Sequence, residues 1–259
     1  MLKKLRFLVL VPLWLACQSS DPSAGFSSEP DFIAYNDDAP LRKKTICFDE
    51  NCNELSGEEN YIYNAAGKLI KIEQLSRMVS GKLEVQAYTD HLYNVDGQLT
   101  GKIMYHRNSS GSAWTPGSES QYEYTNGVLS LEKTYMYLYS SLEKVLTAQI
   151  SYEFKDGKKT GQRWSDGQNK LLYRVEYAYK KDVLSLETWY GSDDKVNRTF
   201  EHKFAGNRRQ IGEYLINSRE ELALIEKTYD EKGRLSTQKT KVNNPLLCAL
   251  APGLIRYGY

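Results

Sequence analysis

The sequence predicts an all-β fold: an antiparallel meander of tandem β-hairpin repeats that forms a strongly twisted, curled sheet or an incomplete barrel. Three observations lead to this prediction. A turn motif recurs along the chain, the residues before each turn alternate between ring-bearing and polar side chains, and the chain contains 20 Tyr but only 7 Phe. Tyrosine suits a half-buried sheet, because its ring can pack while its hydroxyl stays in water.

The turn motif is marked by an aromatic residue, which we call the anchor of each repeat. Successive anchors are separated by 30, 31, 30, 25, 25 and 25 residues. They are Tyr63, Tyr93, Tyr124, Phe154, Tyr179, Phe204 and Tyr229. A period of this length indicates tandem structural units.

Each anchor is followed, three or four positions later, by a residue that tolerates a left-handed backbone. These residues are Gly67, Gly97, Gly127, Gly157, Asp182, Asn207 and Gly233. Gly, Asn and Asp adopt a positive φ at the lowest cost, and a hairpin turn closed by a β-bulge needs such a residue. The motif therefore predicts a β-hairpin at each anchor.

The strand that enters each turn alternates between two kinds of side chain. The positions two residues before the anchors hold Tyr61, His91, Tyr122, Tyr152, Tyr177, His202 and Lys227. The positions three residues before the anchors are polar, which is the period-two pattern of a half-buried strand. Seven hairpins give about fourteen strands, and a sheet of this size curls.

One repeat fills every position of a known motif. The segment Tyr229-Asp230-Glu231-Lys232-Gly233-Arg234-Leu235 resembles the YD repeat of the RHS family. Residues 45–240 as a whole resemble uncharacterised YD-repeat lipoproteins of Gram-negative bacteria. RHS proteins use such repeats to build a shell around a separate cargo domain, and this chain is too short to carry both. The resemblance implies a fold and an envelope location, and it implies no activity.

The N-terminus has the pattern of an export signal. A basic segment is followed by a short apolar run and then by Ala16-Cys17. The small residue before Cys17 resembles a bacterial lipobox, which implies that residues 1–16 are a lipoprotein signal peptide and that Cys17 is lipidated. Gln18 after it implies delivery to the outer membrane. The alternative is an ordinary secretory signal with a coincidental Cys.

The rest of the chain divides into three parts. Residues 17–40 are rich in Ser, Asp, Pro and Gly and are expected to form a flexible tether. Residues 41–245 are predicted to be the YD-type repeat domain, and residues 246–259 an apolar C-terminal tail that packs on the sheet. Without residues 1–16 the chain has 31 basic and 33 acidic side chains, so no positive field attracts nucleic acid.

Export would place the remaining cysteines in an oxidising compartment. The segment from Phe48 to Leu55 looks like a degenerate repeat turn with Cys52 in the glycine position. A Cys47–Cys52 disulfide across this turn is one expectation, and two free buried thiols are the other.

No catalytic residue, metal site or cofactor is predicted. The chain lacks the Gly-x-Ser-x-Gly, His-Glu-x-x-His and phosphate-loop motifs. His91 and His202 occupy a repeat position otherwise held mainly by Tyr, so packing explains them better than metal binding. His106 has no Cys or His at ligand spacing.

The connections between hairpins are the more promising place for a site. They lie opposite the Gly turns and are longer in the first half, which is typical of the binding side of a repeat array. Ligand-contacting aromatic residues are expected near that end: Trp114, Trp164, Trp189 and Tyr190. The alternative is that these rings cap the apolar face of the sheet.

These observations lead to the hypothesis of a non-enzymatic lipoprotein, anchored by its N-terminal lipid in the outer membrane at the cell surface or the periplasmic face. It would be a binding or scaffold module for a glycan or an envelope protein. One alternative is an envelope glycan hydrolase, which needs two carboxyl groups about 5–10 Å apart in an aromatic-lined cleft. The other is a carrier of a hydrophobic molecule inside the rolled sheet.

Overall fold

The computed structural model describes residues 40–49, 51–107, 111–139, 141–215, 220–244 and 253–259. The predicted signal peptide, Cys17 and all of the predicted tether except residue 40 lie outside these residues. The described part of the chain consists of β-strands joined by turns and short connections. The strands are β1 (Lys43–Cys47), β2 (Leu55–Tyr63), β3 (Leu69–Arg77), β4 (Leu83–Tyr93), β5 (Leu99–His106), β6 (Thr115–Thr125), β7 (Val128–Tyr137), β8 (Lys144–Lys155), β9 (Lys158–Asp166), β10 (Leu171–Lys180), β11 (Val183–Gly191), β12 (Val196–Ala205), β13 (Arg208–Leu215), β14 (Glu221–Tyr229), β15 (Leu235–Val242) and β16 (Gly253–Gly258).

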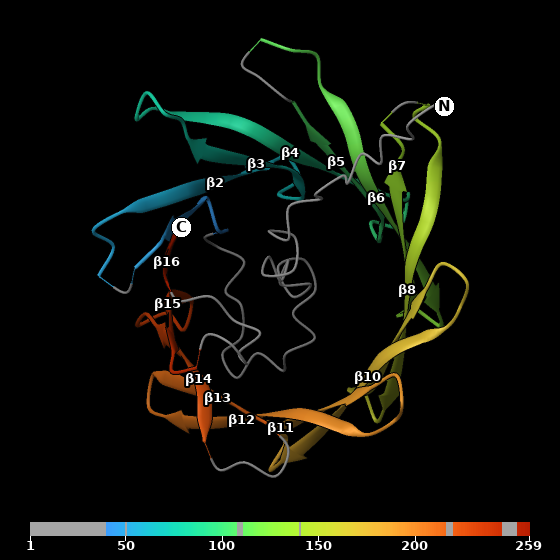
Figure 1. Cartoon of the computed structure of the whole chain (residues 1–259), viewed down its shortest axis with the longest axis vertical. Coiled ribbons are helices and arrows are strands. Elements are labelled where there is room, and N and C mark those ends of the chain that lie inside the picture. Colours follow the sequence, from blue (N-terminus) through green and yellow to red (C-terminus); the bar gives the residue numbers. More distant parts are fainter. Residues whose placement is uncertain (1–39, 50, 108–110, 140, 216–219, 245–252) are drawn as a thin grey trace, which may run out of the picture.

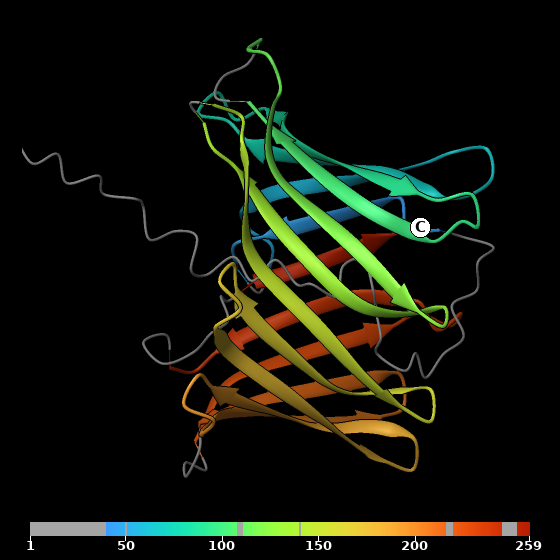
Figure 2. The same cartoon turned by 90° about the vertical axis from the view of Figure 1, so that its right-hand side faces the viewer.

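The sixteen strands form one closed antiparallel barrel. Each strand pairs with the strands before and after it in the chain, and β1 also pairs with β16. Figure 1 shows the resulting ring of strands, and Figure 2 shows from the side that the strands run obliquely around it. The predicted all-β antiparallel meander is confirmed. The predicted curled sheet or incomplete barrel is corrected to a closed barrel, because one more hairpin exists than the repeat count includes.

The turns at the anchors explain why the motif contains Asp or Asn and then Gly. In the last of these turns the Asp230 side chain accepts hydrogen bonds from the backbone N–H groups of Lys232 (3.0 Å) and Arg234 (2.8 Å). Gly233 then closes the turn with a φ of 79°. The acidic or amide residue therefore holds the turn, and the glycine supplies the left-handed backbone that the turn needs.

One predicted turn residue is corrected. After Phe204 the residue with positive φ is Gly206 (φ 60°) and not Asn207. Glycine takes this conformation at no steric cost, so the two-residue turn places it on Gly206. At Asp182 the prediction of a left-handed residue is confirmed, with a φ of 69°.

Most tyrosine anchors tie their hairpin to the one before it. The phenolic hydroxyl donates a hydrogen bond to a backbone carbonyl near the start of the outgoing strand of the preceding hairpin. We call this contact the anchor bond, and it joins Tyr93 to Leu69 (2.8 Å), Tyr124 to Leu99 (2.9 Å) and Tyr179 to Lys159 (2.8 Å). A phenylalanine anchor has no hydroxyl with which to make it.

An eighth anchor, which the sequence analysis did not identify, completes the series. Tyr259 lies 30 residues after Tyr229. Its hydroxyl donates to the Leu235 carbonyl at 3.0 Å, which is the anchor bond of the other repeats. The hairpin to which it belongs is divided, because its incoming strand is β16 and its outgoing strand is β1.

The divided hairpin closes the barrel. Along its whole length β1 pairs with β16, and the Tyr63 hydroxyl donates to the Leu41 carbonyl at 2.8 Å on the far side of this seam. Residues 253–258 therefore form a strand of the sheet, in place of the predicted packing of the tail on its surface. The physical reason is that the backbone groups at the edges of β1 and β15 need a partner strand.

The strand register separates an inner from an outer wall. Buried side chains gather on one face of the sheet, including Tyr61, His91, Tyr122, Ile150, Val175, Phe200, His202 and Ile211. The inside of a closed barrel is concave, so side chains crowd together there, and we assign this face as the inner wall. A ring of sixteen strands is too wide for its own inward side chains to fill, so the core is a thin layer along the wall.

Candidate functional site

Four aromatic side chains form a continuous row on the inner wall of β9 to β12, which we call the aromatic ladder. Ring centroids lie 4.9 Å apart between Trp164 and Tyr173, 5.3 Å between Tyr173 and Trp189, and 5.7 Å between Trp189 and Phe200. The first two pairs are stacked. The stacked rings cover one another's faces, so their edges rather than their faces are left to line the wall.

The polar atoms of the ladder are hydrogen-bond donors. The indole N–H of Trp164 is buried and has no hydrogen-bond partner among the described residues. The indole N–H of Trp189 donates to Glu187 at 3.2 Å. Burial raises the pKa of Tyr173, so its hydroxyl keeps its proton and can donate. A buried donor without an acceptor is costly, and a bound molecule with oxygen acceptors would remove that cost.

A band of polar and charged side chains runs along the inner wall beside the ladder, and we call it the polar belt. Most neighbouring residues of the belt are joined by hydrogen bonds, ion pairs or cation–π contacts. Tyr177 and Glu187 are neighbours because they pair directly across β10 and β11. In order, its members are Lys102, Tyr122, Glu132, Tyr152, Lys159, Tyr177, Glu187, His202 and Arg209. Positive and negative groups alternate, with rings between them, so each buried charge has a compensating neighbour.

The protonation state of His202 follows from its two partners. Its Nδ1 lies 2.7 Å from a guanidinium nitrogen of Arg209, and its Nε2 lies 3.0 Å from the Glu187 carboxylate. A guanidinium can only donate, so Nδ1 accepts and Nε2 carries the proton that is donated to Glu187. His202 is therefore a neutral bridge between an acid and a base.

The tyrosines of the belt are held in their neutral form. Burial is the main cause that raises the pKa of Tyr122, Tyr152 and Tyr177. The nearby carboxylates of Glu132 and Glu187 raise it further, because a second negative charge beside them is unfavourable. The belt therefore offers hydroxyl groups for hydrogen bonding and no phenolate.

The four predicted ligand-contacting aromatic residues do not come together. Trp164 and Trp189 lie in the ladder, but Tyr190 points to the outer wall, because neighbouring residues of a strand face opposite sides. There its ring lies 3.5 Å from the Arg174 guanidinium carbon. Trp114 lies at another part of the outer wall, edge-on to Tyr88 at 4.8 Å.

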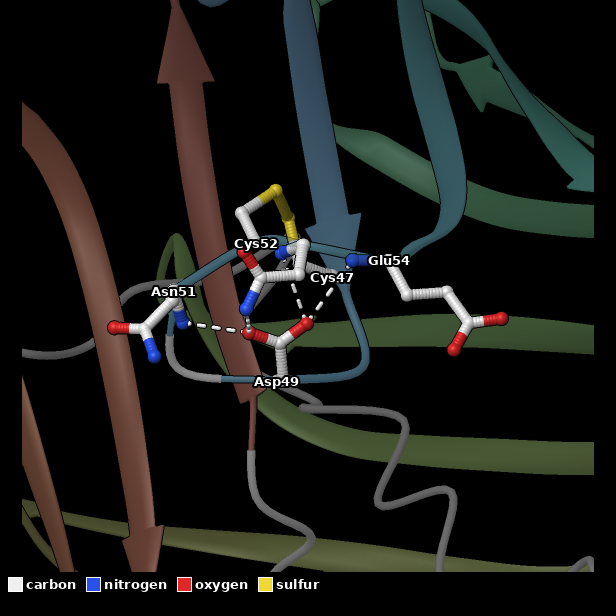
Figure 3. Close-up of a disulfide and its surroundings, with 6 residues drawn as sticks. Cys47, Asp49, Asn51, Cys52 and Glu54 are labelled. Carbon is white, nitrogen blue, oxygen red and sulfur yellow. Dashed lines mark hydrogen bonds between the residues drawn. A yellow bond between two sulfur atoms is a disulfide. The ribbon is translucent and has the colours of Figure 1, made fainter.

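The structure joins Cys47 and Cys52 in a disulfide, with Cα atoms 5.0 Å apart. Cys52 has a φ of 59°, as expected for the glycine position of a degenerate repeat turn. Figure 3 shows the Asp49 carboxylate inside this turn, where it accepts hydrogen bonds from the backbone N–H groups of Asn51 (2.8 Å) and Glu54 (3.0 Å). These bonds lower the pKa of Asp49. The disulfide and Asp49 together fix the connection between β1 and β2.

The described residues contain no group of three or more His, Cys, Asp or Glu side chains that could hold a metal ion. Within the same residues there is no helix of the length and apolar character needed to cross a membrane.

Sequence reasoning missed part of this site. Tyr173 and Phe200 were not singled out. Each stands an even number of residues from a belt residue of its own strand, Tyr177 and His202, so period-two alternation would have placed it on the same wall. Arg198 and Glu213 form a further ion pair on the inner wall beside the ladder, and Glu213 is fully buried. The sequence gives no signal for this pair, because it depends on the register of β12 and β13.

No protein-family model matches the chain, and no curated protein matches it in sequence. Among solved structures it is similar to a porin-like protein from Bacteroides vulgatus, at 12% identity over 85% of this chain and 98% of the other, with a TM-score of 0.47. A porin-like protein from Bacteroides uniformis is 12% identical over 85% and 96%, with a TM-score of 0.38. A protein of unknown function from Bacteroides fragilis is 17% identical over 51% and 89%, with a TM-score of 0.36.

Proposed function

We propose that this chain is a non-enzymatic binding module of the cell envelope and that it binds a glycan on the inner wall of the barrel. The observation that carries the proposal is the aromatic ladder with its polar edges beside the belt. Glycans bind through many hydroxyl groups that both donate and accept hydrogen bonds. The Tyr173 hydroxyl, which keeps its proton, lies between the rings of Trp164 and Trp189 along one line of the wall and can both donate and accept hydrogen bonds.

The geometry favours binding over hydrolysis. Glu187 and Glu213 lie on the inner wall on either side of Phe200, directly opposite it on β11 and β13. Glu187 is engaged by His202 and Trp189, and the fully buried Glu213 is engaged by Arg198. A hydrolase needs one protonated acid and one carboxylate that faces the substrate.

The same wall is unsuited to a hydrophobic cargo. A carrier needs a dry apolar lining, because each polar group buried against an apolar ligand loses its solvation. Here the lining includes Lys102, Glu132, Lys159 and Glu187 in the belt. The belt therefore supports a polar ligand.

A glycan-array screen of the purified full chain would test the proposal. The test variant is Trp189→Ala in the ladder, and the matched control is Tyr190→Ala, the next residue on the opposite wall. We expect binding that Trp189→Ala weakens at least about tenfold, since it removes a ring and a donor, and that Tyr190→Ala leaves unchanged. Equal binding by both variants, or no glycan bound by the parent chain, would remove the glycan from the proposal and favour an envelope protein as partner.

We also propose that the chain is a YD-repeat lipoprotein held at the outer membrane by a lipid on Cys17. The Asp230 and Gly233 turn and the repeated anchor bonds support the YD resemblance, since they give each motif residue a structural role. The outer wall carries ion pairs such as Lys71–Asp90 (3.4 Å) and Lys133–Glu123 (2.5 Å). Strands that face lipid would show an apolar band there, so anchoring through an N-terminal lipid fits this barrel better. Mass spectrometry of the purified mature N-terminus is the direct test.

The path of the chain gives this proposal a point of attachment. Leu41, next to the start of β1, lies at the Gly-turn end of the barrel, where it accepts the anchor bond of Tyr63. Residues 18–40 reach about 80 Å when fully extended. A lipid on Cys17 would therefore hold the barrel within about 80 Å of the membrane, with the chain joining it at the Gly-turn end.

A further inference from the structure

A buried histidine on the inner wall lacks the partners of its repeat equivalent. His91 and His202 both stand two residues before an anchor. His202 uses both ring nitrogens, with Glu187 at 3.0 Å and Arg209 at 2.7 Å. His91 is only 7% exposed, and neither of its ring nitrogens has a well-formed hydrogen bond among the described residues, although the Thr89 backbone lies close enough to favour its protonated form. Two unsatisfied buried polar atoms in one ring require an explanation.

The strand pairing places a basic residue beside His91: Lys102 lies directly opposite it on β5, and the Glu132 carboxylate of the belt acts on Lys102. Thr89 stands two residues before His91 on the same face of β4, where it pairs with Ile72 on β3. No hydrogen bond among the described residues gives His91 the acceptor that Glu187 supplies to His202.

We propose that His91 and Lys102 form a binding site for an anionic oxygen group, a phosphate or a carboxylate, on the inner wall of β4 and β5. An oxygen of the ligand takes the place that Glu187 takes at His202, and the Lys102 ammonium supplies the opposite charge. Phosphate and carboxylate share this chemistry, because both present charged oxygens to an N–H donor and a cation. The site lies six strands away from the centre of the ladder, and Lys102, at the end of the polar belt, is the one residue that it shares with the proposed glycan surface.

The electrostatics of the pair agree with this geometry. Burial first, and then the positive charge of Lys102, lower the pKa of His91 to about 4. Burial also lowers the pKa of Lys102, and the Glu132 carboxylate opposes that shift. An anion between the two groups offsets the positive charge, so it stabilises the protonated imidazole and raises the pKa of His91.

The test is a titration of the full chain with inorganic phosphate and, separately, with acetate, followed by NMR of the imidazole C–H signals. The chain has three histidines, so His91→Gln assigns the signal of interest. We expect one histidine signal to shift in a saturable way and its pKa to rise with ligand. Lys102→Met is expected to weaken binding at least about tenfold, and the control His106→Gln to leave it unchanged.

Each outcome decides the proposal. A response to phosphate alone identifies a phosphate group as the ligand, and a response to acetate alone identifies a carboxylate. No shift with either anion, or equal affinity in the parent and Lys102→Met, overturns the site. If Lys102→Met does not fold, Lys102→Arg and His91→Gln decide the question, since the first keeps the charge and should bind while the second should not. Failure of the glycan screen leaves this result unaffected, because the ladder lies on other strands.

Discussion

The tyrosine hydroxyls at the anchors give individual residues a role that a phenylalanine could not fill. Each accepting carbonyl lies near the start of an outgoing strand, where the sheet passes into its turn. The bond therefore fixes the spacing of neighbouring hairpins at the Gly-turn end. Phe154 and Phe204 show that a repeat can do without it, and both are partly exposed, at 37% and 42%.

Removing one anchor hydroxyl should therefore have a small, measurable cost. We expect Tyr93→Phe to lower the free energy of unfolding by about 1 kcal/mol, since it removes one hydrogen bond and leaves the Leu69 carbonyl without that partner. Urea denaturation would measure the change. Tyr88→Phe, which keeps the ring contacts with Tyr105 and Trp114, is the matched control. Equal stability of Tyr93→Phe and the parent chain would mean that the anchor bond does not hold the hairpins together.

The prediction of the aromatic site residues was limited because it did not use the alternation of side chains between the two walls. Trp189 and Tyr190 are neighbours in β11, so they point to opposite walls, and period-two alternation alone was enough to separate them. Trp114 precedes β6 in a connection whose path cannot be read from composition. Of the polar belt, the sequence indicated only the residues two positions before the anchors, and it indicated them as packing residues. Their acidic and basic partners lie on the paired strands, so they could be found only once the strand register was known.

At the level of single elements, the hairpins were the most predictable part of the molecule. The seven turns lie where the motif places them, because a left-handed residue and a side-chain acceptor are local requirements that leave a trace in the sequence. The exception is the turn at Gly206, where two suitable residues stand side by side. Strand pairing then follows directly, since each turn is short enough to join only adjacent strands.

A glycine substitution can test whether the left-handed backbone of the turn is the reason that glycine stands there. Gly67 has a φ of 76°, and a Cβ atom built there meets no other atom within 4 Å. Gly67→Ala should thus destabilise the chain by about 1 kcal/mol through backbone strain alone. Gly67→Asn should cost less, because Asn tolerates the left-handed region. Urea denaturation compares the two, and an equal loss would show that strain at this position is not the cause.

At the scale of the whole molecule, closure was the feature that the sequence analysis did not capture. The eighth hairpin has no Gly turn of its own, because its two strands come from opposite ends of the described chain. Its only sequence signal is the position of Tyr259, 30 residues after Tyr229. With seven repeats counted, a curled open sheet was the expected result, and with eight the ring closes.

The seam also gives the barrel its most vulnerable point. The pairing of β16 is short, with four residue pairs to β15 and five to β1, against eight between β12 and β13. Deleting residues 253–259 should leave the edges of β15 and β1 open and cause association of chains, since exposed strand edges pair with one another. Size-exclusion chromatography with light scattering would detect it. Removal of Tyr259 alone, which keeps β16, should not change the measured mass.

Because β16 and β1 are two halves of one hairpin, the repeat ring has no first unit in a structural sense. A short turn sequence that joined Tyr259 to Leu41 would make the eighth hairpin like the other seven, and the chain could then be opened at any other Gly turn. Such a circular permutant should keep the same walls, ladder and belt. Only the position at which the proposed N-terminal tether joins the ring would move, and it could be set at any repeat by the choice of cut.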